Sequence, residues 1–590
     1  MTEKINRLVE ALPERYQPIY GFEHFTSDAE RESSDRLEIV MNIANLMTNY
    51  LKRPIRVLDL GCAQGFFSLN LAGVSESVTG IDYLDKNVEL CSGLAEYHNF
   101  EHVKFFENDI ATFVSTLKPN DYDLVLGLNV FHHVNYALGY DETKKIIKKI
   151  AQNSKVLLTE LALKEEPLYW SESLPESVYS NLDGIAYQYT LQKFATHLSS
   201  VERPFIFSSD YMWCDGQNIG EFTTWKNEPH EYSNGYHLNS RRYFFSESNV
   251  IKCYYFHGAQ KENNIKEFQR EYDYYNSGYK FPSFLPQILS CTVNEWQGLV
   301  VLEKIDGKLL SSKINEGDDF SCHDVIHKLL INVTKLEENN LYHNDLRIWN
   351  VLINLNGELS FIDIGSISSS SKTSSWPFNV LADFIILTRD IVKAKSEDVT
   401  AVRYPFLLNG WYDDERIKKW ISLIWGHSYK NWSFKLFLEL WNESEVREVV
   451  SLHNDNFKYW MELVETFLVV NPREEKFINS LLQESFAEYH NKLSAQIQNA
   501  LFLINSVDEK NKTFYLDYNE KLKYLSATIE QLVLNNNNNT ALIENGKKEN
   551  IENIENIERK YLELSERINK IEIKKQSIFK KVMNKLFPKQ

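Results

Sequence analysis

The spacing of apolar and polar positions divides the chain into zones of different periodicity. Residues 1–50 are helical in pattern, and residues 55–160 alternate short apolar runs with amphipathic stretches, as strand–helix–strand units do. An irregular stretch rich in Tyr and Trp follows, to about residue 235. Residues 241–305 then predict strands around one helix, and residues 320–475 predict helices interrupted by a loop segment. The pattern indicates an α/β domain followed by an α+β domain.

From about residue 480 the composition shifts to Glu, Lys, Asn, Leu and Ile at heptad spacing. The gaps alternate between three and four along Ile554, Ile557, Tyr561, Leu564, Ile568 and Ile571. That is the a/d pattern of a coiled coil. We therefore predict a coiled coil over 480–573, with a polar break near 535–550. Such a seam needs partner chains, and its Ile-rich positions favour a homotrimer. The alternative is a single amphipathic helix packed on the preceding domain.

The last 17 residues, KKQSIFKKVMNKLFPKQ, hold six Lys and no acidic residue. Their apolar side chains fall on one helical face, opposite the lysines. A basic face opposite an apolar face is typical of a helix that lies on a membrane surface. We predict this role for residues 574–590, the alternative being a solvated end of the coiled coil.

Composition narrows the class of protein. The 590 residues are 43% hydrophobic and 25% charged, as in ordinary globular domains. The net charge of −18 excludes a generally basic surface for nucleic acid. Six scattered cysteines are too few for a disulfide scaffold and suggest reduced thiols in a cytoplasm. No apolar run is long enough for a membrane span, and the N-terminal stretch lacks the apolar core of a signal peptide.

A first candidate site follows the run Val57-Leu58-Asp59-Leu60-Gly61-Cys62-Ala63-Gln64-Gly65, a buried strand that ends in a glycine turn. Glycine lets the backbone approach a ligand closely, and the next helix offers its free N–H groups. A second strand ends in Asp82, whose carboxylate suits the hydroxyls of a ribose. A third ends at Asn108 and Asp109, within reach of an adenine. A fourth leaves through Leu128.

This D-x-G-C-x-x-G turn, with an Asp after the second strand and Asn-Asp after the third, resembles the class I S-adenosylmethionine-dependent methyltransferases over roughly residues 55–160. The resemblance implies a Rossmann-like fold in which Gly61 touches the methionine part of the cofactor and Asp82 the ribose. It assigns the adenine to Asn108, Asp109 and Ile110, and it adds Asp59 and Leu128 to the cofactor-binding residues. The alternative is an NAD-type binder or a decayed cofactor site.

His132 and His133 follow the fourth strand and are expected to face the methyl acceptor. A histidine in that position suits a general base. A pair that only lines the pocket is an equally good interpretation.

A second candidate site follows from His343-Asn344-Asp345-Leu346-Arg347-Ile348-Trp349-Asn350, with Asp363 lying 18 residues after Asp345. Asp345 suits the proton of an attacking hydroxyl, and Asn350 and Asp363 suit a metal ion that bridges phosphates. Oxygen ligands favour Mg²⁺ over zinc. Upstream, Lys252 lies on a predicted strand and Glu271 on a predicted helix, where the two can pair.

H-x-D-L-x-x-x-N followed by I-D-x-G resembles the protein-kinase fold, in its small-molecule branch, over roughly residues 240–475. The resemblance implies ATP, with adenine against the backbone of Glu303, Lys304 and Ile305 and against Leu352. No G-x-G-x-x-G motif precedes Lys252, so Arg241 or Arg242 is expected to supply the phosphate contacts. The alternative is an inactive pseudokinase.

The order of domains, with the segments LPERYQPIYG, KEEPLYW and SRRYFF, resembles the bifunctional methyltransferase–kinase chain terminators of bacterial O-antigen polysaccharides over nearly the whole chain. In that family Tyr16, Gln17 and Arg36 would close over the cofactor.

The resemblance to the chain terminators also implies a reaction order and a set of partners. The kinase phosphorylates the non-reducing terminal mannose of a lipid-linked, mannan-type glycan, and the methyltransferase then methylates that phosphate, which ends elongation. A polymerising glycosyltransferase and the cytoplasmic face of the inner membrane are implied as partners. Two alternatives stay open: a decayed membrane scaffold that recruits a glycosyltransferase, and the same chemistry on another acceptor.

The predicted fold class is thus an α/β class I methyltransferase domain plus an α+β protein-kinase-like domain and a C-terminal coiled coil. The predicted boundaries are 1–210 for the methyltransferase, 211–240 for a linker and the start of the kinase N-lobe, and 241–475 for the kinase.

Overall fold

The protein is described from a computed structural model. The structure describes residues 2–29, 33–196, 200–230, 233, 237, 239–372, 379–392, 414–444, 455–456 and 458–466. No helix in this described part is long and apolar enough to cross a bilayer. None of the six cysteines, all within the described residues, forms a disulfide. The predicted coiled coil and the basic C-terminal helix lie outside the described residues.

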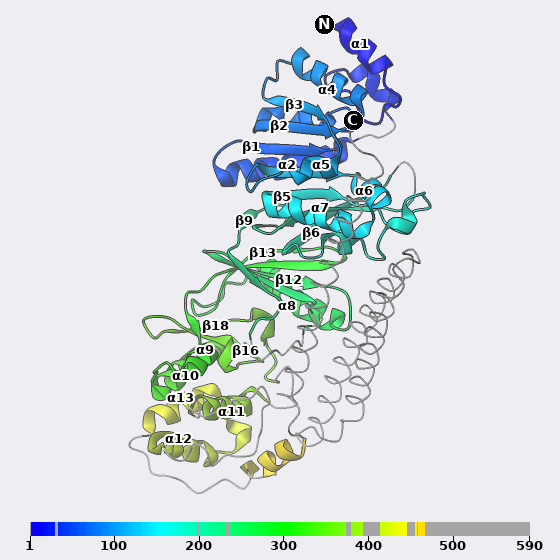
Figure 1. Ribbon diagram of the computed structural model, residues 1–590. Coiled ribbons are helices and arrows are strands. Elements are labelled where there is room, and N and C mark those ends of the chain that lie inside the picture. The colour runs from blue at the N-terminus through cyan, green and yellow to red at the C-terminus, as the bar shows by residue number, and fades with distance from the viewer. Residues whose placement is uncertain are drawn as a thin grey trace, which may run out of the picture. The chain divides into compact units, whose positions relative to one another are not determined.

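The first domain is built on a seven-stranded sheet of order β3-β2-β1-β4-β5-β7-β6 (Figure 1). The strands are β1 (Ile55–Leu60), β2 (Ser75–Asp82), β3 (Val103–Glu107), β4 (Tyr122–Leu128), β5 (Ser154–Glu160), β6 (Tyr187–Phe194) and β7 (Arg203–Ser209). The first five run parallel, whereas β7 pairs antiparallel with both β5 and β6. The order reverses next to β1, which puts the ends of β1, β2 and β4 at the point where doubly wound sheets bind ligands.

Helices cover both faces of this sheet: α1 (Thr2–Glu10), α2 (Ser34–Leu51), α3 (Phe66–Asn70), α4 (Asp85–Tyr97), α5 (Ile110–Ser115), α6 (Phe131–Leu138) and α7 (Tyr140–Asn153). Alternate residues of β1 serve the two faces, because strand side chains alternate. Val57 packs in the core that contains Val40 and Leu94, and Leu58 packs in the core that contains Ile147. The parallel strands are therefore buried on both sides, which explains their uninterrupted apolar runs.

The stretch expected to be irregular, up to about residue 235, contains regular elements. Strands β6 and β7 complete the first sheet, and β8 (Met212–Cys214) and β9 (Ile219–Glu221) form a separate hairpin. The strand signal was obscured because Tyr, Gln and Lys occupy alternate positions in β6, where large amphipathic side chains replace simple aliphatic ones. The irregular interpretation was therefore wrong for these segments.

The second domain begins with a five-stranded sheet of order β10-β11-β12-β14-β13 and one helix (Figure 1). Its elements are β10 (Thr224–Lys226), β11 (Arg241–Phe245), β12 (Asn249–Tyr255), α8 (Lys261–Ser277), β13 (Ile288–Val293) and β14 (Gln297–Glu303). All pairings in this sheet are antiparallel. Strands around one helix were predicted for 241–305, and the prediction is confirmed.

A mainly helical lobe follows the second sheet. Its helices are α9 (Leu310–Glu316), α10 (Cys322–Glu338), α11 (Val380–Val392), α12 (Glu415–Trp425) and α13 (Phe434–Glu443). Short strands flank the candidate catalytic residues: β15 (Lys308–Leu309) directly precedes α9, and β16 (Tyr342–His343), β17 (Val351–Ile353), β18 (Leu359–Phe361) and β19 (Ile367–Ser368) lie between α10 and α11. Trp420 and Trp441 pack edge to face, 5.2 Å apart, at the centre of this lobe.

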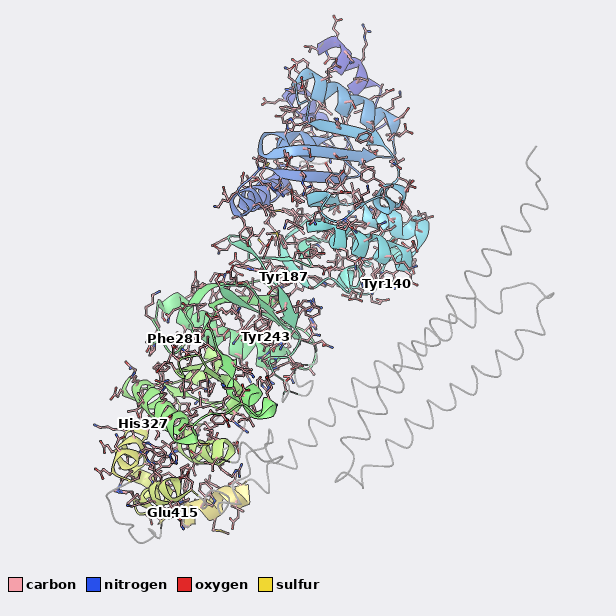
Figure 2. All side chains as sticks on the ribbon, turned by 60° about the vertical axis from the view of Figure 1, so that its left-hand side comes forward. Tyr140, Tyr187, Tyr243, Phe281, His327 and Glu415 are labelled. Atoms are coloured by element: carbon pink, nitrogen blue, oxygen red, sulfur yellow. The ribbon has the colours of Figure 1, made fainter. Side chains whose placement is uncertain are left out.

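The two sheets share one hydrophobic core. Tyr187 on β6 lies 5.1 Å from Phe244 on β11, and both are fully buried together with Ile251 on β12. Figure 2 labels Tyr187 and Tyr243, the residue that precedes Phe244 in the sequence. Polar contacts reinforce this junction: Ser290 Oγ donates to Asp215 at 2.6 Å. The first domain and the second sheet therefore form one packed body rather than two domains on a flexible linker.

Candidate active sites

The carboxyl edge of the first sheet holds a pocket. Its lining combines most of the predicted cofactor residues with three more, Ser33, Phe67 and Asn129: Tyr16, Gln17, Ser33, Arg36, Asp59, Gly61, Phe67, Leu128 and Asn129. Gly61 has φ +69, and a Cβ at this position would lie 2.3 Å from Val130 Cγ1, so only glycine fits. The turn is shaped to let a ligand approach the backbone, as its sequence predicted.

An N-terminal segment is fastened across this glycine turn. The backbone N–H of Gln17 donates to Gln64 Oε1 at 2.9 Å, and the N–H of Phe66 donates to Gln17 Oε1 at 3.2 Å. These reciprocal bonds hold Tyr16 and Gln17 over the pocket, although they lie more than 40 residues before the turn.

Two carboxylates lie at the ends of β1 and β2. Burial raises the pKa of Asp59 to about 6, and the nearby charge of Asp82 acts in the same direction. A 2.6 Å hydrogen bond from Ser68 Oγ opposes this shift. Burial also raises the pKa of Asp82, which accepts from the backbone N–H groups of Ala63 and Leu84, each at 2.9 Å. A carboxylate has about four acceptor positions, so Asp82 retains capacity for a ribose hydroxyl.

Beyond β3, Asn108 donates its backbone N–H to Asp82 O at 2.9 Å, and Asp109 caps α5 through Thr112 N at 2.8 Å. Ile110 opens that helix. The structure thus places the segment predicted to border adenine next to the end of β2, where Asn108 contacts Asp82.

Tyr83 was missed from the sequence, although it directly follows Asp82. Its ring is 80% exposed at the same edge of the sheet, where it is available to stack on a base.

A buried ionic network lies behind the pocket. Arg36 forms two hydrogen bonds to Glu160, at 2.9 and 3.1 Å, and Asn129 Nδ2 donates to the same carboxylate at 3.0 Å. Arg203 donates to Asn129 Oδ1 at 2.8 Å and binds Glu166 through two nitrogens, at 2.8 and 2.6 Å. Paired buried charges of this kind hold one geometry, because breaking any pair leaves a charge without water. The network couples the cofactor pocket to the KEEPLYW segment.

His132 and His133 begin α6, directly after the pocket residues Leu128 and Asn129. His132 is buried and lies 4.4 Å from the ring of Trp170, whereas His133 is exposed and its Nδ1 lies 3.2 Å from Tyr169 Oη. Although the side chain reaches solvent, partial desolvation of its ring beside His132 and Trp170, together with the charge of Arg203, lowers the pKa of His133. This imidazole is therefore mainly neutral at neutral pH.

The second candidate site is assembled around Lys252 on β12. Its Nζ donates to Glu271 Oε1 of α8 at 2.8 Å and to Asp363 Oδ1 at 3.2 Å. Burial alone would lower the pKa of Lys252, but the charges of Glu271 and Asp363 hold it well above its usual value. Burial alone would raise the pKa of Asp363, yet Lys252 and Ser366 hold it far below. Lys252 and Asp363 are thus held in the charged state, whereas burial raises the pKa of Glu271 against the charge of Lys252.

Asp345 and Asn350 lie together in the loop before β17. Asn350 Nδ2 donates to the backbone carbonyl of Asp345 at 2.8 Å and to its Oδ2 at 3.1 Å. The amide oxygen of Asn350 is thereby turned away from Asp345. With Asp363, which has φ +66, it supplies the hard oxygen donors that Mg²⁺ prefers. The donor set fits magnesium and not zinc.

No glycine-rich loop precedes Lys252, and both arginines expected to replace its phosphate contacts already form hydrogen bonds within the protein. Arg241 donates to Asn264 Oδ1 and Glu267 Oε2 on α8, each at 2.7 Å, whereas Arg242 donates to backbone carbonyls of Ile185 and Ala186 in the first domain. Among the described residues, Nη2 of Arg241 makes no hydrogen bond. Nε of Arg242 has none either, but Arg242 is bound to the first domain, whereas the charge of Arg241 acts on Asp363 of the candidate site. Arg241 is therefore the better placed of the pair to contact phosphate.

The segment between β10 and β11 contributes a residue that the sequence did not single out. His230 stacks on Trp349 of the candidate catalytic loop at 4.8 Å, and the Arg347 guanidinium lies 4.5 Å from the centre of the same ring. Burial lowers the pKa of His230 to about 4 despite the attraction of Asp345 and Asp363. Only the tertiary stack on Trp349 marks this residue.

The predicted adenine-binding segment leaves β14 at Glu303. The backbone N–H of Glu303 donates to Gln287 O and that of Lys304 to Ser248 O, whereas the N–H of Ile305 has no partner among the described residues. Gly307, at φ +159, passes against Leu352 on β17. An unpaired backbone donor opposite an apolar side chain suits a purine base.

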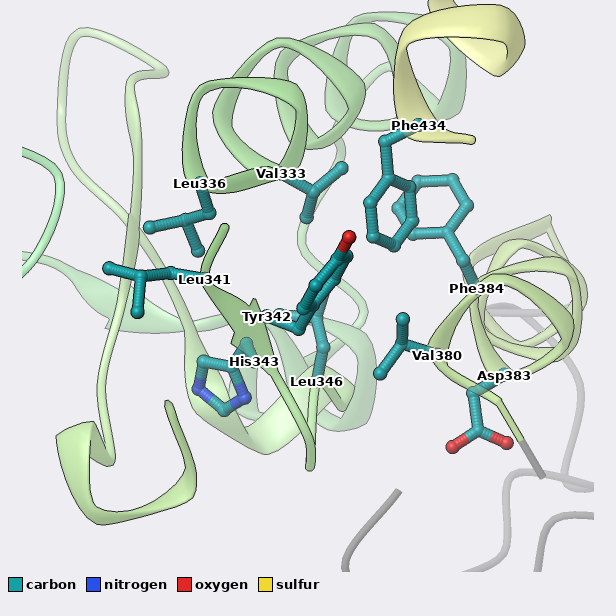
Figure 3. A pocket seen from close by; sticks show the side chains of 10 residues that line it. All are labelled: Val333, Leu336, Leu341, Tyr342, His343, Leu346, Val380, Asp383, Phe384 and Phe434. Atoms are coloured by element: carbon teal, nitrogen blue, oxygen red, sulfur yellow. The ribbon is translucent and has the colours of Figure 1, made fainter. Parts of the chain in front are cut away.

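A further small pocket is lined by residues of the candidate catalytic loop and of α10, α11 and α13 (Figure 3). Its lining is mostly apolar: Val333, Leu336, Leu341, Tyr342, His343, Leu346, Val380, Asp383, Phe384 and Phe434. His343 turns its Nε2 to the carbonyl of Ile362 at 2.8 Å. The pocket belongs to the packing that supports the loop from below, and it contains neither Asp345, Asn350 nor Asp363.

Comparisons with known proteins agree with both domains. The methyltransferase domain family matches residues 51–201. Two Escherichia coli proteins, each described as the O-antigen chain terminator bifunctional methyltransferase/kinase WbdD, are 32% identical over 480 and 481 residues. Each match covers 80% of this chain and 67% of the relative.

Solved structures of WbdD match the second domain as well as the first. A medium-resolution structure of the bifunctional kinase-methyltransferase has a TM-score of 0.67 at 30% identity, covering 78% of this chain and all of that one. A low-resolution structure with an ordered C-terminal bundle has a TM-score of 0.72 at 29% identity and covers 83% of this chain.

Proposed function

Because the chain belongs to the family of bifunctional methyltransferase/kinase O-antigen chain terminators, we propose that it phosphorylates the terminal sugar of a lipid-linked glycan, mannose by the resemblance, and then methylates that phosphate. Membership of this family gives the chain both activities, methyltransferase and kinase. The sugar, the order of steps and the residue roles are the proposal.

In the phosphorylation step, Asp345 accepts the proton of the sugar hydroxyl as that oxygen attacks the γ-phosphate of ATP. Asn350 and Asp363 would hold Mg²⁺, which when bound would neutralise charge on the phosphates. Lys252, fixed by Glu271, and the remaining donor of Arg241 bind the phosphate oxygens. The backbone of Glu303, Lys304 and Ile305 receives adenine, with Leu352 against its face.

In the methylation step, Tyr16, Gln17 and Arg36 close the pocket, and Asp59, Gly61 and Leu128 line it. Asp82 holds the ribose and Asn108, Asp109 and Ile110 border the adenine. A phosphate monoester is already anionic at neutral pH, so methyl transfer needs no strong base. His132 and His133 then serve as hydrogen-bond donors that place a phosphate oxygen in line with the methyl group.

The observation that carries the proposal is the charged cluster of Lys252, Glu271 and Asp363 beside the Asp345–Asn350 pair. Lys252 and Glu271 are buried, whereas Asp345 and Asp363 are partly exposed, as groups that contact a substrate must be. Burial of a charged pair destabilises a fold unless its geometry is well satisfied, so the retained Lys252–Glu271 pair favours an active site over a decayed scaffold.

The test is Asp345→Ala in the full chain, supplied with ATP, Mg²⁺, S-adenosylmethionine and synthetic mannosides. We expect mass spectrometry to detect neither phosphate nor methyl on the bare mannoside. A pre-phosphorylated mannoside should regain the methyl group. Asp82→Ala is the reciprocal control, which should phosphorylate but not methylate. Methylation of the bare mannoside by Asp345→Ala would overturn the phosphate-first order.

We further propose that residues 480–573 join copies of the chain, as a trimer, and that residues 574–590 bind the inner membrane beside a polymerising glycosyltransferase. The heptad pattern and the six lysines support this. Each lysine near an anionic leaflet contributes roughly 1 kcal/mol, and joined copies add their contributions. Deleting 574–590 should release an active protein from membranes. A monomer in light scattering would contradict the coiled coil.

A further inference from the structure

Two of the most exposed aromatic side chains of the first domain lie side by side. Tyr136 on α6 is 59% exposed and Tyr169, in the segment after β5, is 62% exposed. Their ring centroids are 5.0 Å apart and the rings are nearly perpendicular, at 86°. Leu138, 49% exposed, lies on the same helix. A gathered group of exposed rings is unusual enough on a soluble surface to require a reason.

The pair is built on a rigid base. Tyr169 packs edge to face on Trp170 at 4.7 Å, and Trp170 is only 4% exposed. The same segment is anchored through Glu166, whose carboxylate takes two hydrogen bonds from the buried Arg203. The exposed ring of Tyr169 is therefore pre-organised, so a ligand that binds to it does not have to order a loop.

The rings also continue the methyltransferase site. Leu128 and Asn129 line the cofactor pocket, and α6 starts two residues later with His132 and His133 in its first turn. Tyr169 Oη lies 3.2 Å from His133 Nδ1. One path thus runs from the methyl donor through His133 to Tyr169 and Tyr136, outward to solvent.

We propose that Tyr136 and Tyr169 form a saccharide subsite that holds the sugar rings behind the methyl-accepting phosphate. This inference rests on the proposed function, since it takes the acceptor to be the phosphorylated end of a glycan. The apolar C–H face of a pyranose packs on the electron-rich face of an aromatic ring, and two perpendicular rings contact two successive sugars of a bent chain.

The observations favour a glycan over other occupants. Two rings and one leucine are too small a surface for a stable protein interface, which takes about 800 Å² from each partner. The exposed members of the group, Tyr136, Tyr169 and Leu138, are uncharged, whereas a membrane-binding surface combines apolar groups with lysines and arginines. Two uncharged exposed rings beside His133 suit a chain of neutral sugars that ends in a phosphate.

The test compares acceptors of different length in the full chain. Variants Tyr136→Ala, Tyr169→Ala and the double variant are assayed with a phosphorylated tetramannoside and with mannose monophosphate, and tetramannoside binding is measured by saturation-transfer NMR and calorimetry. Tyr169→Phe keeps the ring but loses the hydroxyl. Tyr211→Ala is the matched control, because Tyr211 is 44% exposed and follows β7 at the opposite edge of the sheet.

We expect each alanine variant to raise the KM for the tetramannoside, and its dissociation constant, by about tenfold, the equivalent of one ring contact. The KM for mannose monophosphate and the affinity for S-adenosylmethionine should stay at their wild-type values. Tyr169→Phe should keep most of the affinity. An unchanged tetramannoside affinity in the double variant would overturn the subsite.

Failure of the proposed function has a different signature from failure of the subsite. If the wild type binds tetramannoside through these tyrosines yet methylates no phosphorylated mannoside, the phosphate-methylation proposal is wrong and the subsite stands. If the double variant instead changes self-association in light scattering, with saccharide binding unaltered, the rings are a protein contact and the subsite is wrong.

Discussion

Asp59 shows how one buried residue links cofactor binding to pH. Its pKa of about 6 in the cofactor-free protein lies above the ordinary value of 3.8, so protonation favours the folded state. That stabilisation is complete below about pH 4 and is lost as pH rises through 6. The cationic cofactor has the opposite preference, because its positive groups favour the carboxylate.

The affinity for S-adenosylmethionine should therefore be constant above about pH 6 and fall towards tenfold per pH unit below it. Calorimetry between pH 5 and pH 8 would record this profile and the proton released on binding. Asp59→Asn should bind more weakly at pH 8 and show a flat profile. A wild-type affinity that does not change between pH 5 and pH 8 would show that Asp59 does not face the cofactor's charge.

The pair formed by Lys252 and Glu271 permits a second prediction at this scale. Glu271→Gln leaves Lys252 with Asp363 alone, so its ammonium should shift away from the phosphates. We expect phosphorylation to slow by roughly 10- to 100-fold, since misplacement by about 1 Å costs that much, while cofactor binding in the first domain is unchanged. Asp273→Asn, on the exposed side of α8, is the control and should phosphorylate at the wild-type rate.

At the scale of elements, Asp123 fastens β4 to the start of β1. Its buried carboxylate accepts two hydrogen bonds from Arg53, at 2.8 and 2.7 Å, and three from Arg56, of which the backbone N–H bond is 2.9 Å. Burial alone would raise the pKa of Asp123, but the arginines lower it to about 2. The resulting stabilisation is present above about pH 4 and is lost as pH falls towards 2.

Asp123→Asn should lower the free energy of unfolding by about 2 kcal/mol at pH 7. Urea titrations at pH 7 and at pH 3 would measure the difference between the variant and the wild type, which should shrink at the lower pH. Equal stability of the variant and the wild type at pH 7 would show that the hydrogen bonds from Arg53 and Arg56 to Asp123 do not stabilise the fold.

For the whole molecule, the shared core predicts joint unfolding of the first domain and the second sheet. Phe244→Ala removes a fully buried ring between Tyr187 and Phe222, at a cost of roughly 3–5 kcal/mol. Binding of S-adenosylmethionine and of ATP should be lost at the same, lower urea concentration. Trp441→Ala, in the helical lobe, should lower the midpoint for ATP alone. Separate midpoints in Phe244→Ala would contradict one cooperative body.

The sequence predicted those parts of the fold and of the candidate sites whose residues are related by short-range spacing along the chain. Asp345, Asn350 and Asp363 were found because their separation is set by one loop and one hairpin, which short-range geometry dictates. Strand β6 was missed because its large amphipathic side chains mask the apolar pattern. Strand β7 was missed because it is buried on both faces and shows no alternation.

The residues that sequence reasoning did not find depend on tertiary contacts. His230 reaches the kinase site only by stacking on Trp349, more than 100 residues away. Tyr169 becomes notable only through its exposure and its neighbour Tyr136. Neither the stacking of His230 nor the exposure of Tyr169 depends on the spacing of residues along the chain, so a sequence pattern does not reveal them.

The shared core has a consequence for chimeras. An exchange of parts between relatives that cuts near residue 210 would split one core and leave Tyr187 and Phe244 facing foreign surfaces. The junction that spares every interior contact of that core lies after β14, where the chain leaves at Glu303 and passes Gly307. One module is then the methyltransferase together with the nucleotide-binding sheet, and the other is the helical lobe that carries Asp345. Val300 and Leu302 of β14 also pack in the core of that lobe, so an exchange at this junction must bring side chains that fit them.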